Sequence, residues 1–314
     1  MESALVVTGS DEKYFPLVVE LLTSIRAQDH WVDVGVIDAG MTSAQKEELQ
    51  AVYGCIVRSF KPESERLKMA IAKRPALAVN LGKLWLDVLF PEFETLIFLD
   101  ADTWVQDWKA IDWLAGGASK NALAIVPTWN RYRNRFPIYW LFGLLPIFRS
   151  FNVKAAFHAY LPWSAMRSIG DRADLNAGVY ALRRDAPHWE RMRQWQHVIL
   201  KRGRPFTSDG LAMALACHFD GCKVQLMPEF CNYLGEFLYD QQRHALVDFF
   251  HPHDPVGVVH FANHKKIRFD KNYESNVVCL NGHIQKINVR FGEGNFNVCH
   301  TKEPLHNIMI PCSF

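Results

Sequence analysis

The strongest constraint on the fold is an alternation of short apolar runs with helical segments over the first hundred residues. Short β-rich runs that alternate with helices are typical of a parallel sheet covered by helices. Such sheets bind ligands outside the carboxyl ends of their strands. We therefore predict an α/β fold with its functional site at that edge. Strands are expected over residues 4–7, 32–40, 55–60 and 95–99, and helices over residues 15–25, 42–54 and 77–90.

The composition excludes several classes of protein. An apolar fraction of 49% and a charged fraction of 22% are ordinary for a globular chain. A formal net charge of +2 gives no reason to expect nucleic acid as a partner. The seven cysteines have no regular spacing, which favours reduced thiols in a cytoplasmic protein and makes a zinc site unlikely on sequence grounds. The N-terminal residues do not resemble a signal peptide, and no apolar run reaches membrane-spanning length.

The stretch ETLIFLDADTWVQDW, residues 94–108, ends an apolar strand on two acidic residues. Asp100 and Asp102 project from the same face as long as the chain stays extended. Two carboxylates held together repel each other unless a positive group lies between them, and a divalent cation is the usual one. The alternative is a strand-to-helix turn in which Asp102 or Thr103 caps the following helix.

The first strand leads into the loop Thr8-Gly9-Ser10-Asp11, which lies at the same expected edge of the sheet. This loop contains neither GxGxxG nor GxxxxGK, the two glycine-rich patterns that cradle phosphates. A nucleotide that binds here is therefore not held by a glycine-rich phosphate loop.

Residues 129–163 interrupt the α/β pattern. Arg131, Arg133 and Arg135 alternate with aromatic residues, and the apolar stretch PIYWLFGLLPIF follows. We expect an insertion, either a helical hairpin or a flap, that forms part of an acceptor site or packs on the domain surface. It is too short and too interrupted to span a bilayer, but a peripheral contact with the inner membrane face stays open.

The pattern resumes after the insertion. A strand begins near residue 175 and precedes a helix up to residue 200, and another helix covers residues 208–219. Residues 271–314 are rich in β-forming, Gly and Asn residues and indicate either a strand pair or a loosely ordered tail.

Several polar residues follow one another in an order that resembles a known family. Together they resemble the GT-A glycosyltransferases, most closely the retaining family that includes glycogenin and the bacterial lipopolysaccharide galactosyltransferases. The resemblance covers residues 3–270, so we expect a transferase domain over 1–270 with the insertion at 129–163, and an extension of unknown role over 271–314. The residues that carry it are Asp11, Tyr14, Lys83, Asp100-Ala-Asp102, Asn176-Ala-Gly178, Asp209 and HFANHKK at 260–266.

The resemblance implies a metal-dependent transfer of a hexose from a UDP-sugar to a glycan or glycolipid acceptor. It assigns the divalent ion, Mn²⁺ with Mg²⁺ as the alternative, to Asp100, Asp102 and His260. Asn176 and Asp209 would bind hydroxyls of the transferred sugar. The remaining donor contacts would be Gly9, Asp11 and Tyr14 for the uracil base, Lys83 and Asp100 for the donor ribose or sugar, and Lys266 for the diphosphate.

General chemistry supports the assignment of a metal. Cleavage of a sugar–phosphate bond needs stabilisation of the departing diphosphate, which a divalent ion and a fixed cation can supply. Mixed carboxylate and imidazole ligands suit Mn²⁺. Each residue also has a structural alternative: Asn176-Ala-Gly178 as a tight turn, Asp209 as a helix cap, and His260 as a core histidine.

The sequence departs from the family at three places. Gly210 stands where close members often have Gln after the aspartate, which argues against a covalent route through that Gln and leaves a front-face route. Asn263 replaces a commoner Gly, and the Pro-Trp that often follows the lysine is missing, so Lys266 is the least secure assignment.

Three other functions remain open at this stage. An inverting transferase needs a carboxylate as general base, and Asp171, Asp174 and Asp209 are available. A haloacid-dehalogenase-type phosphatase also has two aspartates after an apolar strand, but it has Thr or Val where this chain has Trp104. A non-catalytic carbohydrate-binding module would have no need to keep all three expected metal ligands.

Overall fold

The computed structural model describes residues 3–28, 30–128, 138–148, 150–262, 264–292 and 296. Its centre is a seven-stranded sheet with the strand order β10-β6-β9-β4-β1-β2-β3. Only β9 runs antiparallel to its two neighbours in this sheet, β4 and β6. This mostly parallel sheet confirms the predicted α/β fold. The strands are β1 (Ala4–Ser10), β2 (Asp33–Asp38), β3 (Ile56–Ser59), β4 (Thr95–Leu99), β6 (Leu123–Pro127), β9 (Leu175–Arg183) and β10 (Val224–Leu226).

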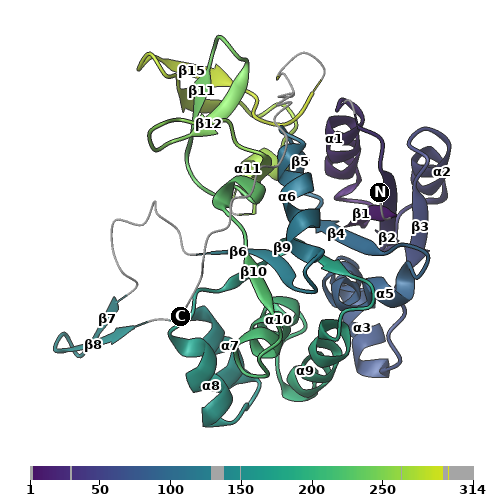
Figure 1. Ribbon diagram of the computed structural model, residues 1–314, viewed down its shortest axis with the longest axis vertical. Helices are drawn as coiled ribbons and strands as arrows, with labels where there is room; N and C mark the ends of the chain where they lie inside the picture. Colours follow the sequence, from purple (N-terminus) through teal and green to yellow (C-terminus); the bar gives the residue numbers. More distant parts are fainter. Residues whose placement is uncertain are drawn as a thin grey trace.

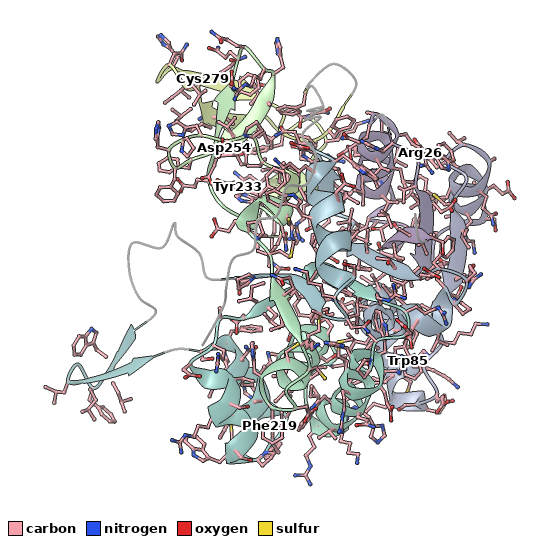
Figure 2. The ribbon with its side chains drawn as sticks, viewed as in Figure 1. Arg26, Trp85, Phe219, Tyr233, Asp254 and Cys279 are labelled. Atoms are coloured by element: carbon pink, nitrogen blue, oxygen red, sulfur yellow. The ribbon has the colours of Figure 1, made fainter. Side chains whose placement is uncertain are left out.

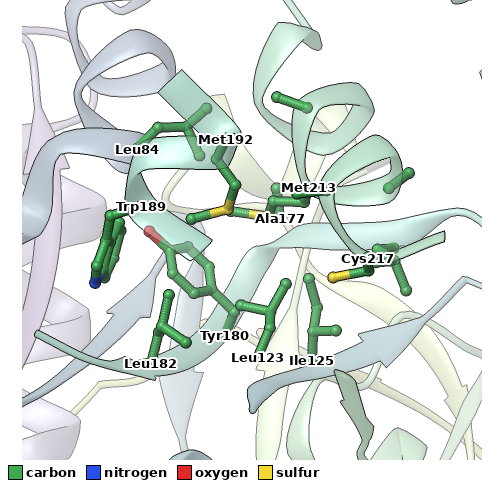
Figure 3. Close-up of a cluster of buried hydrophobic side chains, with 14 of the residues drawn as sticks. Leu84, Leu123, Ile125, Ala177, Tyr180, Leu182, Trp189, Met192, Met213 and Cys217 are labelled. Atoms are coloured by element: carbon green, nitrogen blue, oxygen red, sulfur yellow. The ribbon is translucent and has the colours of Figure 1, made fainter. Parts of the chain in front are cut away.

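Helices pack on both faces of the sheet (Figure 1). One face is covered by α1 (Phe15–Arg26), α2 (Ser43–Ala51) and α6 (Lys109–Ala118). The other face carries α4 (Leu77–Gly82), η1 (Lys83–Trp85), α5 (Leu86–Leu89), α7 (Phe151–His158), α8 (Trp163–Gly170), α9 (His188–Arg202) and α10 (Ser208–His218). Helix α3 (Glu65–Lys73) has no buried residue and lies at the rim. Figure 3 shows the apolar core between the sheet and this second set of helices. In it, Tyr180 and Leu182 of β9 lie beneath Met192 of α9 and Met213 of α10.

Local sequence explains these elements. All five residues of β4 are buried, as a continuous apolar run in a sheet covered on both faces requires. Helix α2 begins with a capping box in which the Thr42 side chain and the Gln45 side chain each accept from the other residue's backbone N–H. The helix expected over residues 77–90 is broken into α4, η1 and α5, and the break falls at Lys83.

A smaller group of strands packs against one end of the sheet. It contains β11 (Phe237–Asp240), β12 (Ala245–Asp248), β14 (Ser275–Val278) and β15 (Ile284–Ile287), with their own apolar core around Trp104. The Trp104 Nε1–H donates to the Val289 carbonyl at 3.2 Å. The antiparallel pairing of β14 with β15 confirms the strand pair expected after residue 270. Residues 297–314 lie outside the described residues.

The second group of strands is connected to the site through one short pair. Strand β5 (Thr103–Val105) follows β4 and pairs antiparallel with β13 (Val258–His260), so that His260 lies opposite Thr103. The short η2 (Glu229–Cys231) precedes this group, and α11 (Lys265–Phe269) follows β13.

Within the expected insertion at 129–163, residues 138–148 form a β-hairpin and Phe151–His158 form helix α7. Strands β7 (Ile138–Leu141) and β8 (Leu145–Phe148) pair antiparallel and stand away from the sheet and helices, as Figures 1 and 2 show. The helical alternative is therefore wrong for residues 138–148, because aromatic and branched residues around a Gly143 turn favour a hairpin. Residues 129–137, with Arg131, Arg133 and Arg135, lie outside the described residues. Within the described ranges, no helix is both long and apolar enough to cross a membrane.

Candidate active site

A cavity of about 970 Å³ opens at the carboxyl ends of β1 and β4, the edge where the sequence predicts a site. Its volume is in the range of small-molecule and cofactor sites. Nine of the ten predicted site residues line it, and Lys266 does not. The nine are Gly9, Asp11, Tyr14, Lys83, Asp100, Asp102, Asn176, Asp209 and His260.

The two aspartates come together through a turn rather than an extended chain. The Thr103 backbone N–H and its Oγ1 both donate to the Asp100 carbonyl, at 3.1 and 2.8 Å. Strand β5 follows immediately, and the next helix, α6, begins only at Lys109. The alternative in which Asp102 or Thr103 caps a helix is therefore wrong.

Asp100, Asp102 and His260 form a cluster that could hold a metal ion. One ligand atom from each residue lies within 4.8 Å of the others. The His260 Nε2 is 3.4 Å from Asp102 Oδ1 and 4.0 Å from Asp100 Oδ2. This set of two carboxylates and one imidazole fits a divalent cation.

The orientation of His260 is set by a buried amide. His260 Nδ1 lies 2.8 Å from Asn232 Oδ1, and both residues are buried. A carbonyl oxygen can only accept, so Nδ1 carries a proton. Nε2, which faces the two carboxylates, is therefore the nitrogen that would bind a metal ion. Metal-binding histidines are usually held by such a partner. Sequence reasoning missed Asn232, because nothing in the local sequence links it to His260.

Gly178 on β9 allows these groups to approach one another. A Cβ at this position would lie 2.5 Å from His260 Cε1, 2.7 Å from Asp100 Oδ2 and 2.8 Å from Asn176 Oδ1. The Asp100 N–H donates to the Gly178 carbonyl at 2.7 Å, and the Gly178 N–H donates to Asn176 Oδ1 at 2.8 Å. Residues 176–178 belong to β9, so the tight-turn alternative is wrong.

Lys83 joins two carboxylates at the floor of the cavity. Its buried ammonium lies 2.8 Å from Asp100 Oδ1 and 3.4 Å from Asp209 Oδ2. Burial alone would lower the pKa of Lys83, but the two carboxylates outweigh burial and raise it, so Lys83 stays protonated. Asp209 lies in the first turn of α10, where no side chain caps the helix. The helix-cap alternative for Asp209 is therefore wrong.

Arg268 on α11 provides the cation on the other side of the cluster. Its Nη1 is 3.1 Å from Asp102 Oδ2. Burial would raise the pKa of Asp102, but a hydrogen bond and the charge of His260, together with Arg268, hold that pKa at about 2. Lys266 is exposed, with its ammonium 5.7 Å from the Tyr273 ring centroid. Sequence reasoning selected the lysine of HFANHKK and missed the arginine two positions later.

The end of β1 and the loop that follows it form another wall of the cavity. A Cβ on Gly9 would lie 2.6 Å from two Val79 methyl carbons, so this glycine is required for packing against α4. Asp11 Oδ1 accepts from the Tyr14 N–H at 2.9 Å, and the Tyr14 ring contacts Phe269 edge-on at 5.7 Å. The assignment of Gly9, Asp11 and Tyr14 to a base site stays a prediction.

The chain is similar to several solved glycosyltransferase structures. For galactosyltransferase LgtC in complex with donor and acceptor sugar analogs, the identity is 14%, with 84% of this chain and 88% of that chain covered and a TM-score of 0.48. The glycosyltransferase GlyE of Streptococcus pneumoniae TIGR4 is 14% identical, with 74% of this chain and 47% of that chain covered and a TM-score of 0.45. Mouse xyloside xylosyltransferase 1 is 12% identical, with 82% of this chain and 97% of that chain covered and a TM-score of 0.43. No family model and no curated protein sequence matches the chain.

Proposed function

We propose that the protein is a metal-dependent glycosyltransferase that moves a hexose from a UDP-sugar to a glycan or glycolipid acceptor. The observation that carries the proposal is the Asp100–Asp102–His260 cluster inside a cavity of about 970 Å³ at the carboxyl edge of an α/β sheet. An inactive or purely binding fold has no need for this buried cluster or for Asn232 behind it.

The three ligands would hold Mn²⁺, with Mg²⁺ as the alternative, because an imidazole favours the softer ion. When bound, the ion would supply Lewis-acid stabilisation to the departing diphosphate. We assign the second positive charge on the diphosphate to Arg268 in place of Lys266, because Arg268 lines the cavity and Lys266 does not. A guanidinium can bind phosphate oxygens through two N–H groups at once.

Lys83 and its carboxylates would prepare the sugar site. The ammonium holds Asp209 and Asp100 in place through ion pairs, and each carboxylate still has acceptor positions for sugar hydroxyls. Asn176 accepts from Gly178 through Oδ1, which leaves its side-chain N–H groups to donate to the sugar. The uracil would be placed at Asp11 and Tyr14, where one carboxylate oxygen accepts from the Tyr14 N–H.

The stereochemistry is proposed to be retaining, with inversion as the alternative. Of the three carboxylates considered as a general base, Asp171 does not line the cavity and Asp209 is bound to Lys83. Asp174 does line the cavity. Nuclear magnetic resonance of the first-formed product gives the anomeric configuration. An inverted product, together with loss of transfer in Asp174→Asn, would replace the retaining proposal by the inverting one.

The decisive experiment is a panel of nucleotide sugars assayed for hydrolysis, since transferases of this kind release some sugar to water without an acceptor. We expect one UDP-sugar to be hydrolysed with Mn²⁺ and none in EDTA, and UDP to bind more tightly than GDP by calorimetry. Mg²⁺-dependent release of phosphate from a simple phosphomonoester, with no hydrolysis of nucleotide sugars, would instead indicate the phosphatase. Well-folded protein that binds no UDP in the presence of Mn²⁺ would indicate a non-catalytic module.

A further inference from the structure

The tip of the β7–β8 hairpin carries five exposed apolar side chains. The turn itself contains Phe142 and Gly143, both with positive φ. Large contiguous apolar patches on a protein surface mark interaction sites. The exposed fractions are 63% for Trp140, 43% for Leu141, 86% for Phe142, 78% for Leu144 and 60% for Leu145.

Among the described residues, no packing contact accounts for the exposed tip. β7 and β8 form a two-stranded sheet of their own, separate from the seven-stranded sheet (Figure 1). Figure 2 shows the hairpin projecting away from the sheet and its helices. A lone two-stranded hairpin is at best marginally stable in water. Burial of the apolar tip in a lipid layer or against a partner protein would therefore stabilise the hairpin.

The charge of the surrounding sequence indicates which partner fits. Residues 129–149 contain four arginines, Arg131, Arg133, Arg135 and Arg149, and no acidic residue. A second copy of the chain would bring four more arginines against these four, which is unfavourable. An anionic lipid surface attracts basic residues next to a membrane-inserting segment, and Trp, Phe and Leu are the side chains that enter the interfacial region.

We propose that the β7–β8 tip inserts into the interfacial layer of an anionic membrane. Each strand has four residues, roughly 14 Å of extended chain, so the hairpin reaches into one leaflet and cannot span the bilayer. This membrane contact goes beyond the transfer reaction and does not depend on it.

Co-sedimentation with vesicles tests the proposal in the full-length protein. Vesicles of phosphatidylcholine alone are compared with vesicles that also contain phosphatidylglycerol. The tip variant Phe142→Ser/Leu144→Ser is compared with Trp31→Ser/Val52→Ser, which removes two side chains that are 78% and 70% exposed on the far part of the sheet domain. The thermal melting of all proteins, followed by circular dichroism, checks that they are folded.

We expect wild type and the Trp31/Val52 variant to bind the anionic vesicles, and the tip variant to bind them at least about tenfold more weakly. The removal of one buried large apolar side chain changes an equilibrium constant by about that factor. Arg131→Ser/Arg133→Ser/Arg135→Ser should lose the preference for anionic over neutral vesicles, and added salt should weaken wild-type binding in the same direction.

Three results would overturn the proposal. The first is that wild type binds neither kind of vesicle. The second is that the folded tip variant binds as well as wild type. The third is that light scattering shows a wild-type dimer that the Phe142→Ser/Leu144→Ser change converts to monomer while vesicle binding stays absent, which would assign the tip to a second copy of the chain. Hydrolysis of a nucleotide sugar without vesicles should be equal in the tip variant and wild type, so it reports on the transfer site separately.

Discussion

At the residue scale, the centre of the site is a continuous line of alternating charges. It runs from Asp209 through Lys83, Asp100, His260 and Asp102 to Arg268. Buried charges are tolerated only when they are paired, and each carboxylate here has a cationic or histidine neighbour. Lys83 and Arg268 lie on either side of the space between Asp100, Asp102 and His260, which is the candidate position for a divalent ion.

Asp102→Asn should abolish most of the metal-dependent activity and leave the fold intact. The change keeps the side-chain volume and deletes one ligand charge. Mutation of a residue that only hydrogen-bonds a metal ligand typically lowers metal affinity by about 10–100-fold. The loss of a ligand charge should lower the Mn²⁺ affinity by at least as much. Calorimetry with Mn²⁺ measures this, and the exposed Asp33→Asn is the control. Full activity of Asp102→Asn, or full wild-type activity in EDTA, would rule out this metal site.

Asn232→Ala should weaken Mn²⁺ binding by about 10–100-fold, although Asn232 would contact His260 and not the ion itself. Without Oδ1 the His260 ring loses the acceptor that fixes its Nδ1 proton, so Nε2 is no longer held toward the carboxylates. Asn232→Asp keeps an oxygen acceptor and should restore most of the affinity. If the alanine variant is destabilised but binds Mn²⁺ as tightly as wild type, Asn232 has only a packing role.

At the element scale, the site depends on strands that reverse direction. Strand β9 runs antiparallel between β4 and β6, and β13 runs antiparallel to β5. The first pairing puts Gly178 next to Asp100, and the second puts His260 opposite Thr103.

Sequence patterns predict the local elements well and these long-range pairings poorly. The runs around β1, β2, β3 and β4 are confirmed because a buried strand in a covered sheet needs a continuous apolar segment. Asp100, Asp102 and His260 are predicted as one metal site only through the order of motifs that a known family shares. Arg268 and Asn232 were missed because their roles depend on how β13 and α11 dock against β5, which local sequence does not encode.

Gly178→Ala should destabilise the protein by about 1–3 kcal/mol, the usual cost of an overpacked position. Its new methyl group would meet the imidazole and two side-chain oxygens at 2.5–2.8 Å, so Mn²⁺ binding should weaken as well. Gly116→Ala is the matched control, since nothing lies within 4 Å of the added Cβ on α6. That change should stabilise the helix by up to about 1 kcal/mol. Equal urea midpoints for the two variants would show that the close approach at Gly178 is not required.

At the scale of the whole molecule, the candidate metal ligands come from two parts of the structure. The sheet domain supplies Asp100 and Asp102, and β13 supplies His260 next to the strands of the smaller group. Further contacts join them besides the β5–β13 pair. Trp104 is packed in the core of the smaller group, and Arg290 forms a bidentate pair with Glu20 of α1 at 2.6 and 2.8 Å.

The boundary expected at residue 270 therefore has a direct test in two shortened chains. A chain that ends at residue 270 lacks β14, β15, the Val289 carbonyl that accepts from Trp104, and Arg290. We expect it to melt at a lower temperature than wild type and to bind Mn²⁺ more weakly, because β5 and β13 lose the core that holds them together. A chain that ends at residue 296 keeps these contacts and should behave like wild type in both measurements. If the 270-residue chain keeps the wild-type melting temperature and Mn²⁺ affinity, the segment after residue 270 is an appendage and the transferase domain ends there.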